Sequence, residues 1–383
     1  MLEAAQRLVL CLAFSVAIVL SLKIDGGKVL IIQNKGGGHG TIGYYLCKEL
    51  MANNPSLEIA MIQDKCNYSK APFSSYKDLE SLGVKILDMN LGDEKPEFLD
   101  PEYAQQLSNF KADYIIDNWS KSTTNASFVL DIANKHSPKQ VLFISSAGMY
   151  ESSNVLPLIE SNAVKTNAAR KIELAYSECG HPYTSLRPQY IYGEKSNKRY
   201  LDYFIGRATR KLHTPLPLSA EQLVCLTHVE DVAALIACAI GNEAAMNEIF
   251  NCGTDRYISY KALSQLVHSE VGSAEEDAKY MYFDPLLYST VQFPFRRESF
   301  ITSPSKAKRL LGWKPKHQLQ QDMKQEVSDY KQSAASEKQW VLDDLRGDME
   351  ILASKDVNFM FTYPFFDHPS INPETRPYHF ESA

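Results

Sequence analysis

The sequence lacks the patterns that mark several common classes of binding protein. None of its seven cysteines forms a C-x-x-C pair with another. A zinc knuckle and a dense disulfide framework are therefore not expected, and no metal ligand is predicted. Basic residues are not in excess either: the net charge is −6 at pH 7, whereas nucleic-acid-binding domains are often strongly basic. Contact with RNA would therefore need a local basic patch on an acidic body. The absence of an internal repeat excludes solenoid architectures.

Long hydrophobic runs are also missing. Residues 8–22 are mostly apolar and follow Arg7, but a membrane-spanning helix needs about 20 apolar residues. The run resembles the apolar part of a signal peptide, so residues 1–27 are predicted to be a targeting or signal-like leader. The mature form is then expected to have no stable membrane span. A surplus N-terminal helix, amphipathic or buried, is the alternative interpretation.

Strand and helix patterns alternate from residue 28 to about residue 189. Continuous β-branched, apolar stretches predict buried strands, and stretches with helical spacing lie between them. The expected strands are 28–34, 57–64, 83–90, 112–118, 139–150 and 182–193. This alternation predicts an α/β protein with a Rossmann-type, doubly wound parallel sheet and a small C-terminal lobe.

The character of the sequence changes after about residue 193. Residues 28–192 are predicted to form the nucleotide-binding core, and residues 193–335 a small lobe that includes a strand at 248–254. Residues 336–383 are predicted to begin with a charged helix, which gives way to a segment rich in proline and aromatic residues without any period. We expect this second segment to be extended and to lie on the body of the protein or to dock on a protein partner.

A glycine-rich turn follows the first predicted strand. Gly37 would allow a sharp turn, Gly40 a close approach to a pyrophosphate, and Gly43 close packing of the next helix on the sheet. The helix N-terminus would face the phosphates. Asp64 ends the second strand, where a carboxylate holds the ribose hydroxyls, and Asn118 ends the fourth. These residues predict an NAD or NADP site, with a preference for NAD; an ordinary loop carboxylate is the alternative for Asp64.

Several motifs together resemble the extended short-chain dehydrogenase/reductases, the NAD-dependent epimerase/dehydratase family. They are "GHGTIG", "FISSAGMY", "SLRPQYIYG", "LTHVEDVA", "EIFNCGTDRYIS" and "SKAKRLLGWKP". The resemblance implies a substrate-binding role for Ser146, although a serine at a strand end is more often a cap. It also implies a catalytic Y-x-x-x-K pair downstream of Ser146, and the stretch 159–178 lacks this pair. If Glu173 matches the family's later glutamate, Lys165 replaces the tyrosine and Ala169 the lysine.

A narrower resemblance is to the chloroplast stem-loop-binding proteins of 41 kDa, a divergent branch that lacks the same pair. It is carried by "GGGHGTIG", "DNWSK", "LRPQYIYG" and "IFNCGTDR". The resemblance implies a plastid protein that binds stem-loop or ribosomal RNA, with endoribonuclease activity and ribosome- or transcription-complex partners. A homo- or hetero-oligomer is a separate expectation. The chain departs from the branch in keeping all three glycines and in its long aromatic tail.

Basic clusters with interleaved aromatic residues are the candidates for an RNA surface. The densest cluster contains Lys195, Lys198, Arg199, Arg207, Arg210 and Lys211, with Tyr200, Tyr203 and Phe204 between them. A second contains Arg296 and Arg297, and a third Lys306, Lys308, Arg309, Lys314 and Lys316. The alternative is that the cations form solvated helix faces and the aromatic residues belong to the core.

Three functions therefore remain open. The leading one is a plastid RNA-binding protein, with or without endoribonuclease activity, on a dehydrogenase-like scaffold. The others are an NAD-dependent sugar-nucleotide epimerase or dehydratase with an unusual base, and a non-catalytic NAD(P)-binding scaffold. Asp117, Asn118, His39 and His228 lie near the expected ligand crevice, but no spacing among them identifies a ribonuclease site.

Overall fold

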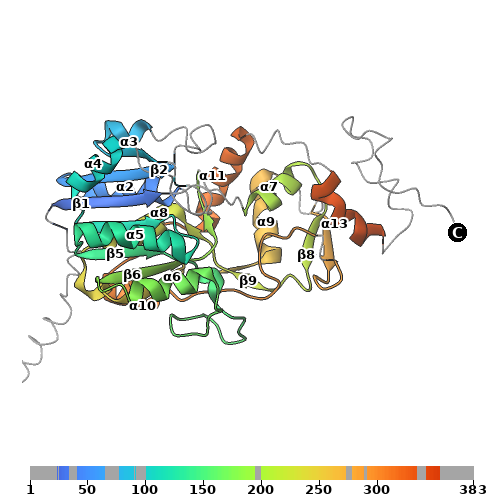
Figure 1. The fold of residues 1–383 in the computed structure, drawn as a ribbon. Coiled ribbons are helices and arrows are strands. Elements are labelled where there is room, and N and C mark those ends of the chain that lie inside the picture. The colour runs from blue at the N-terminus through green and yellow to red at the C-terminus, as the bar shows by residue number, and fades with distance from the viewer. Residues whose placement is uncertain are drawn as a thin grey trace, which may run out of the picture. The chain divides into compact units, whose positions relative to one another are not determined.

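The computed structural model of the chain contains two compact units (Figure 1). It describes residues 24, 26–33, 41–64, 77–89, 91, 101–194, 200–272, 278–288, 291–333 and 342–353. Unit 1 comprises residues up to 198 together with 225–256 and 301–317. Unit 2 comprises 199–224, 257–300 and the residues from 318 onward.

Unit 1 is built on a seven-stranded sheet in which every neighbouring pair of strands is parallel. The strand order is β11-β6-β5-β4-β1-β2-β3. The strands are β1 (Gly27–Gln33), β2 (Leu57–Asp64), β3 (Lys85–Met89), β4 (Tyr114–Asn118), β5 (Gln140–Ile144), β6 (Tyr183–Pro188) and β11 (Glu248–Cys252). This order confirms the predicted Rossmann-type fold. The order reverses between β1 and β4, and in such sheets ligands bind outside the carboxyl ends of the strands at that point.

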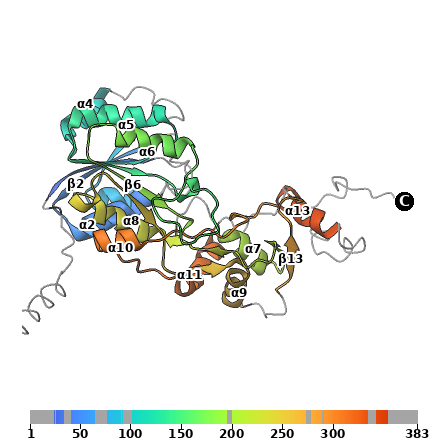
Figure 2. The same ribbon diagram turned by 90° about the horizontal axis from the view of Figure 1, so that it is seen from below.

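Helices cover both faces of this sheet, and Figure 2 shows the three layers. One face carries α2 (Ile42–Asn53), α8 (Val229–Ala239) and α10 (Ser305–Leu311). The other carries α4 (Pro101–Phe110), α5 (Thr123–His136) and α6 (Ala168–Ser177), and a short helix, α3 (Lys77–Ser81), follows β2. Two separate apolar clusters fill the two interfaces. Because both faces are covered, strands such as β4 and β5 are buried at every residue, which explains their continuous apolar sequence.

The structure differs from the sequence-based expectation at three strands. β11, expected in the C-terminal lobe, pairs with β6 at the edge of the main sheet. β5 ends at Ile144 because Ser146 caps a short 3₁₀ helix, Ala147–Met149. The stretch 182–193 divides into β6 and β7 (Ile191–Tyr192), because Tyr190 has a φ of 30°. Local apolar patterning does not specify which sheet a strand joins or where a polar turn interrupts it.

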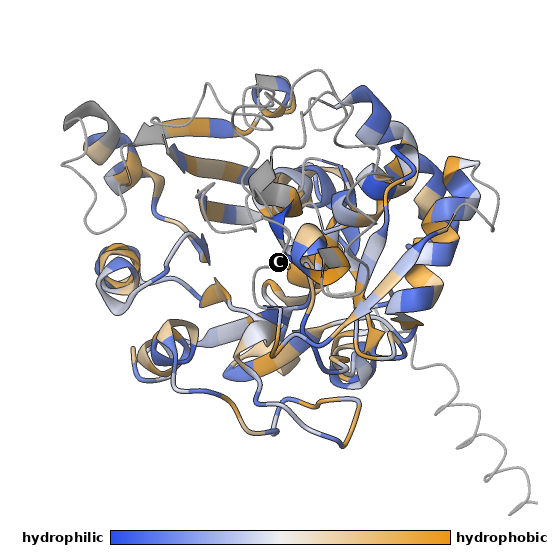
Figure 3. Cartoon of the chain, turned by 90° about the vertical axis from the view of Figure 1, so that its right-hand side faces the viewer, coloured by the Kyte–Doolittle hydropathy of each residue, from blue (hydrophilic) through white to orange (hydrophobic). Residues whose placement is uncertain are grey.

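Unit 2 contains four helices and two pairs of short strands among its described residues. The helices are α7 (Asp202–Thr209), α9 (Tyr260–Val271), α11 (Leu319–Gln332) and α13 (Leu342–Ala353). β8 (Thr214–Pro217) pairs in parallel with β13 (Tyr280–Phe283), and β9 (Leu223–Val224) pairs antiparallel with β12 (Ile258–Ser259). An aromatic cluster stabilises this unit: Tyr203, Phe204, Tyr260, Phe293 and Phe295. Helices in Figure 3 mix hydrophilic and hydrophobic residues, as expected of helices with one buried face.

Within the part of the chain that the structure describes, no helix is both long enough and apolar enough to cross a membrane. The leader up to residue 23 and the tail from residue 354 lie outside the described residues. The expectations for them therefore stay predictions, as does the domain boundary at residue 192.

Candidate functional site

Polar side chains gather where the strand order reverses. Gln33 ends β1 and lies in register with Asn118 at the end of β4 and with Gln63 near the end of β2. Asn118 Nδ2 donates to Gln33 Oε1 at 2.6 Å, and all three side chains are buried. Gln33 Nε2 and both polar atoms of the Gln63 amide have no hydrogen-bond partner among the described residues. Buried polar groups normally have partners, so these amides mark a place suited to a polar ligand.

Gly43 has the packing role expected of the third glycine. A Cβ atom at this position would lie 2.4 Å from Gln33 Oε1 and 3.2 Å from Met61 Cε. Only glycine therefore lets α2 begin this close to β1 and β2 without moving the Gln33–Asn118 pair. Gly37 and Gly40 lie outside the described residues, so their roles stay predictions. Asp64 is the last residue of β2, as expected, but the description does not extend to its side chain.

A pocket of about 230 Å³ lies at the carboxyl ends of β4 and β5. It is lined by Asn118, Trp119, Ser120, Lys121, Phe143, Ile144, Ser145, Ser146, Ala168, Ala169 and Ile172. Ser146 Oγ accepts a hydrogen bond from Gly148 N at 3.1 Å, so this hydroxyl caps the 3₁₀ helix while its residue lines the pocket. The cap interpretation and the substrate-binding interpretation of Ser146 are thus both compatible with its position.

The positions matching the family's catalytic pair carry no phenol. Lys165 is exposed, and its backbone N–H donates to Met149 O. Ala169 lines the pocket. A methyl group cannot lower the pKa of a neighbouring tyrosine as the family's lysine does. The pocket therefore lacks the base that the resemblance implies.

Two tyrosines lie near this pocket, but both are fully buried and hydrogen-bonded within the protein. Tyr150 Oη donates to Asn251 Oδ1 at 2.7 Å and accepts from Arg187 Nη1 at 2.9 Å. Tyr176 Oη donates to Asp117 Oδ2 at 2.7 Å. Burial, together with the Asp117 charge, raises the pKa of Tyr176 well above its ordinary value. Neither phenol can replace the missing proton shuttle.

A buried ion pair that the sequence analysis missed lies beside this pocket. Glu173 accepts from Arg187 Nε at 2.8 Å and Arg187 Nη2 at 2.6 Å, and both side chains are 1% exposed. Glu173 Oε1 also accepts from the hydroxyl of Ser145, at 2.8 Å, and Ser145 lines the pocket. The sequence does not reveal this ion pair, because no local pattern connects Glu173 to an arginine on a strand.

For Arg207, the prediction that the densest basic cluster forms an RNA surface is wrong. This side chain is 2% exposed and forms two hydrogen bonds with the carboxylate of Asp348 in α13. It is therefore a buried structural residue and not a surface cation. Phe204, interleaved in the same cluster, is also buried, in the aromatic core of unit 2.

The other members of this cluster are placed differently. Arg210 is half-buried, and its Nη1 donates to Tyr330 Oη at 2.7 Å. Lys211 is exposed. The remaining members, Lys195, Lys198 and Arg199, lie outside the described residues, so their proposed RNA contacts stay predictions.

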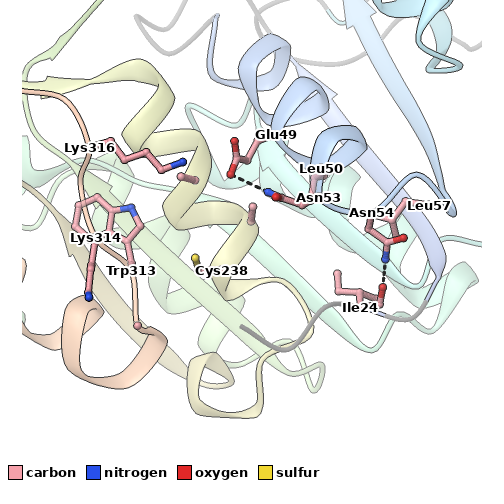
Figure 4. Close-up of a pocket in the computed structure, with 13 residues that line it drawn as sticks. Ile24, Glu49, Leu50, Asn53, Asn54, Leu57, Cys238, Trp313, Lys314 and Lys316 are labelled. Carbon is pink, nitrogen blue, oxygen red and sulfur yellow. Dashed lines mark hydrogen bonds between the residues drawn. The ribbon is translucent and has the colours of Figure 1, made fainter. Parts of the chain in front are cut away.

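The third basic cluster contributes to a second hollow in unit 1. Lys306 and Lys308 are ion-paired with Glu248 and Asp255, both at 2.6 Å, whereas Arg309, Lys314 and Lys316 are exposed. Lys314 and Lys316 line a groove of about 300 Å³ beside α2 and α8 (Figure 4). Glu49, which accepts from Asn53 at 2.8 Å, lines it as well. The groove thus combines an apolar floor with cations and one carboxylate on its rim.

Comparisons with known proteins agree with this architecture. The family model described as "NAD dependent epimerase/dehydratase family" matches residues 36–253. The chain is 29% identical over 300 residues to the chloroplast stem-loop binding protein of 41 kDa b from Arabidopsis thaliana, covering 76% of each sequence.

Solved structures share the fold at low sequence identity. A dTDP-glucose 4,6-dehydratase from Bacillus anthracis in complex with NAD has a TM-score of 0.63 at 15% identity, over 80% of this chain and 97% of that one. A UDP-glucose 4-epimerase from Thermotoga maritima with UDP-glucose has a TM-score of 0.60 at 20% identity, over 80% and 99%. The family model covers more than half of the sequence, and so the chain belongs to the NAD-dependent epimerase/dehydratase family.

Proposed function

We propose that this protein binds stem-loop RNA in plastids and that it does so on a dehydrogenase-type scaffold that no longer transfers hydride. One observation carries the proposal. The curated relative at 29% identity is named as a stem-loop binding protein. If Glu173 matches the family's later glutamate, Lys165 and Ala169 of this chain take the places of the tyrosine and the lysine. A scaffold that keeps its fold but loses its base is available for another ligand.

The proposal gains support from the hydrogen bonds of the buried tyrosines and of Asp117, none of which lines the pocket. A proton shuttle must reach the substrate, but the hydroxyls of Tyr150 and Tyr176 are buried and bonded to Asn251 and Asp117. Asp117 also accepts from the backbone N–H groups of Trp119 and Ser120, both at 2.9 Å. Its burial raises its pKa despite these bonds. Within the described residues, these groups serve the fold and not proton transfer.

A dinucleotide is the second ligand that we propose, as a bound group without turnover. The described residues fit one: Gly43 permits the close approach of α2, and the buried amides of Gln33, Gln63 and Asn118 lie at the strand ends. NAD, when bound, would supply a hydride acceptor. Without a phenol in the pocket, oxidation of a sugar hydroxyl would lack its proton acceptor. We therefore expect binding of NAD(H) with no epimerase or dehydratase activity on nucleotide sugars.

For RNA, the groove that carries Lys314 and Lys316 is the best candidate surface among the described residues. Both side chains are exposed, and ammonium groups bind phosphates as point charges. Lys306 and Lys308 are less available, because each already pairs with a carboxylate. RNA affinity should therefore depend on Lys314 and Lys316 more than on cations of equal exposure elsewhere.

The test measures binding of a labelled stem-loop RNA to the full chain across a salt series. We expect affinity to fall steeply with salt, and Lys314→Gln with Lys316→Gln to reduce the slope by about one unit per lysine. Lys171→Gln with Lys324→Gln removes the same charge from exposed positions outside the groove and is the matched control. An affinity that is independent of salt, or an equal effect of the control pair, would contradict the proposed surface. Following the RNA length in the same samples tests for endoribonuclease activity.

A further inference from the structure

Two histidines and a glutamate lie together at the start of α8 in unit 1, and one of the histidines comes from a distant part of the sequence. His228 ends β10 (Thr227–His228), Glu230 lies in the first turn of α8, and His317 follows α10. One possible ligand atom from each residue can be chosen so that all three lie within 4.8 Å of one another. The two imidazole rings are stacked, with centroids 3.6 Å apart, and His317 Nε2 lies 3.3 Å from Glu230 Oε2.

The backbone around the cluster is held by Asp231. Its carboxylate accepts hydrogen bonds from Lys316 N at 2.7 Å and His317 N at 3.0 Å. Its carbonyl oxygen accepts from Trp313 Nε1 at 3.0 Å. These bonds attach the segment after α10 to the first turn of α8, so His317 is positioned relative to His228 before any ligand arrives.

His228 caps the N-terminus of α8 with one of its two ring nitrogens. His228 Nδ1 accepts from Glu230 N at 3.2 Å, so the proton of the neutral ring is on Nε2, and a metal bound at Nε2 would displace that proton. The space next to Nε2 depends on Gly193, whose φ is +116°. A Cβ at this position would lie 2.8 Å from Nε2, so glycine keeps room there. A side chain at residue 193 would fill this room.

We propose that His228, Glu230 and His317 bind one divalent transition-metal ion of the zinc class. Two imidazoles and one carboxylate form a common ligand set for zinc, with water in the fourth tetrahedral position. Zn–N distances of about 2.0–2.1 Å place two nitrogens about 3.4 Å apart, which lies within the 4.8 Å spread of the possible ligand atoms. The rings must tilt so that their lone pairs converge, and a proton on His317 Nε2 must leave on binding.

Metal binding at this position would cross-link α8 to the segment after α10. An ion that binds the folded chain and not the unfolded chain stabilises the fold by mass action, so the melting temperature should rise with zinc concentration. The inference is independent of RNA binding and of NAD binding, because no residue of this cluster lines either pocket described above. The cluster could not be predicted from the sequence, because no local spacing links His317 to His228.

The test uses the purified full chain under reducing conditions, with Zn²⁺ in calorimetry and Co²⁺ in visible spectroscopy. We expect one ion per chain and a tetrahedral Co²⁺ spectrum without sulfur-to-metal charge transfer. Loss of a supporting residue costs 10–100-fold in metal affinity, so His317→Asn, which removes a ligand, should cost on the order of 100-fold. Glu230→Gln should weaken binding in the same way and abolish the zinc-dependent rise in melting temperature.

His181→Asn is the matched control, since His181 is a partly exposed histidine bonded to Asn134 and outside the cluster. It should bind zinc as the unaltered chain does. Glu230 is an exposed side chain, so Glu230→Gln keeps the test valid if His317→Asn does not fold. The proposal is overturned by absence of stoichiometric binding, by a thiolate–Co²⁺ band, or by equal affinities of Glu230→Gln and His181→Asn.

Discussion

Each unit contains a buried arginine that is paired with a carboxylate, and the two pairs differ in what surrounds them. In unit 1, Arg187 of β6 donates two hydrogen bonds to Glu173 of α6. In unit 2, Arg207 of α7 pairs with Asp348 of α13, with Arg207 Nη2 3.1 Å from Asp348 Oδ1. All four side chains are at most 2% exposed.

The unit 1 pair belongs to a network beside the pocket. Ser145 donates to Glu173, and Arg187 donates to the hydroxyl of Tyr150, which donates in turn to Asn251. In unit 2, Arg207 also donates to the carbonyl oxygen of His213, at 2.8 Å, and its guanidinium lies over the ring of Tyr203, 4.5 Å from the centroid. The same chemistry therefore positions a pocket wall in one unit and attaches a C-terminal helix in the other.

The largest expected effect comes from neutralising one carboxylate of each pair. Glu173→Gln and Asp348→Asn should each lower the free energy of unfolding by about 3–5 kcal/mol, because a buried guanidinium loses its counter-charge. Urea unfolding measures this loss. Only Glu173→Gln should also weaken NAD(H) binding, because only Glu173 contacts a residue that lines the pocket. Equal effects of both variants on NAD(H) binding would remove the distinction between the two pairs.

Replacing both partners of a pair with apolar residues should affect the free energy of unfolding differently in the two units. Arg207→Met with Asp348→Leu should regain most of the lost stability, because well-packed apolar side chains can replace a buried ion pair. Arg187→Met with Glu173→Leu should remain about 1–3 kcal/mol less stable than the unaltered chain, since Ser145 and Tyr150 lose buried partners. The two double variants are compared in the same urea experiment. A full recovery in unit 1 would show that its network does not depend on the pair.

The stability of unit 2 should also depend on pH, because His213 lies close to the charge of Arg207. Burial, then the charges of Lys279 and Arg207, lower the pKa of His213 to about 4 from 6.5. Between these values the unfolded chain binds the extra proton, so stability should fall as pH falls from 6.5 to 4. His213→Asn should remove this part of the pH dependence of the free energy of unfolding, which we expect to be about 1–2 kcal/mol after solvent screening. The difference between the urea midpoints of the two chains, followed from pH 6.5 to pH 4, measures it. Parallel slopes for both chains would contradict this assignment.

The smallest effect is expected at the rim of the unit 1 network. Arg170 donates to Glu173 at 3.1 Å, but its side chain is 30% exposed. Arg170→Ala should therefore cost less than about 1 kcal/mol in unfolding free energy. A loss as large as that of Glu173→Gln would mean that Arg170, and not Arg187, supplies the main counter-charge.

Much of the fold could be predicted because its signals are local. Continuous apolar stretches gave β1 and β4 nearly to the residue, since strands covered on both faces need apolar side chains throughout. Gly43 could be predicted because close packing of a helix start on a strand follows from a missing Cβ. The absence of the family's tyrosine and lysine was also visible, because the resemblance implies where in the sequence the pair should lie. Roles that depend on one strand, one turn or one missing atom can be inferred from the sequence.

The partners of charged side chains could not be predicted in this way. Arg207 lies in a basic, aromatic stretch that suggested an RNA surface, yet its partner Asp348 is 141 residues away. Arg187 and Glu173 meet because β6 and α6 pack together, and β11 joins the main sheet by pairing with β6. Helical periodicity shows that a face exists but not what covers it.

The sequence alone thus determined the alternating order of strands and helices, the glycine turn and the loss of the family's tyrosine and lysine. Each of these features depends only on residues that are close together in the sequence. Only the tertiary structure decided which cations are buried, which carboxylates pair with them and which histidines meet at α8. The physical reason is that the energy of a charge depends on its solvent exposure and on groups within a few ångströms, and folding brings those groups together from distant parts of the chain.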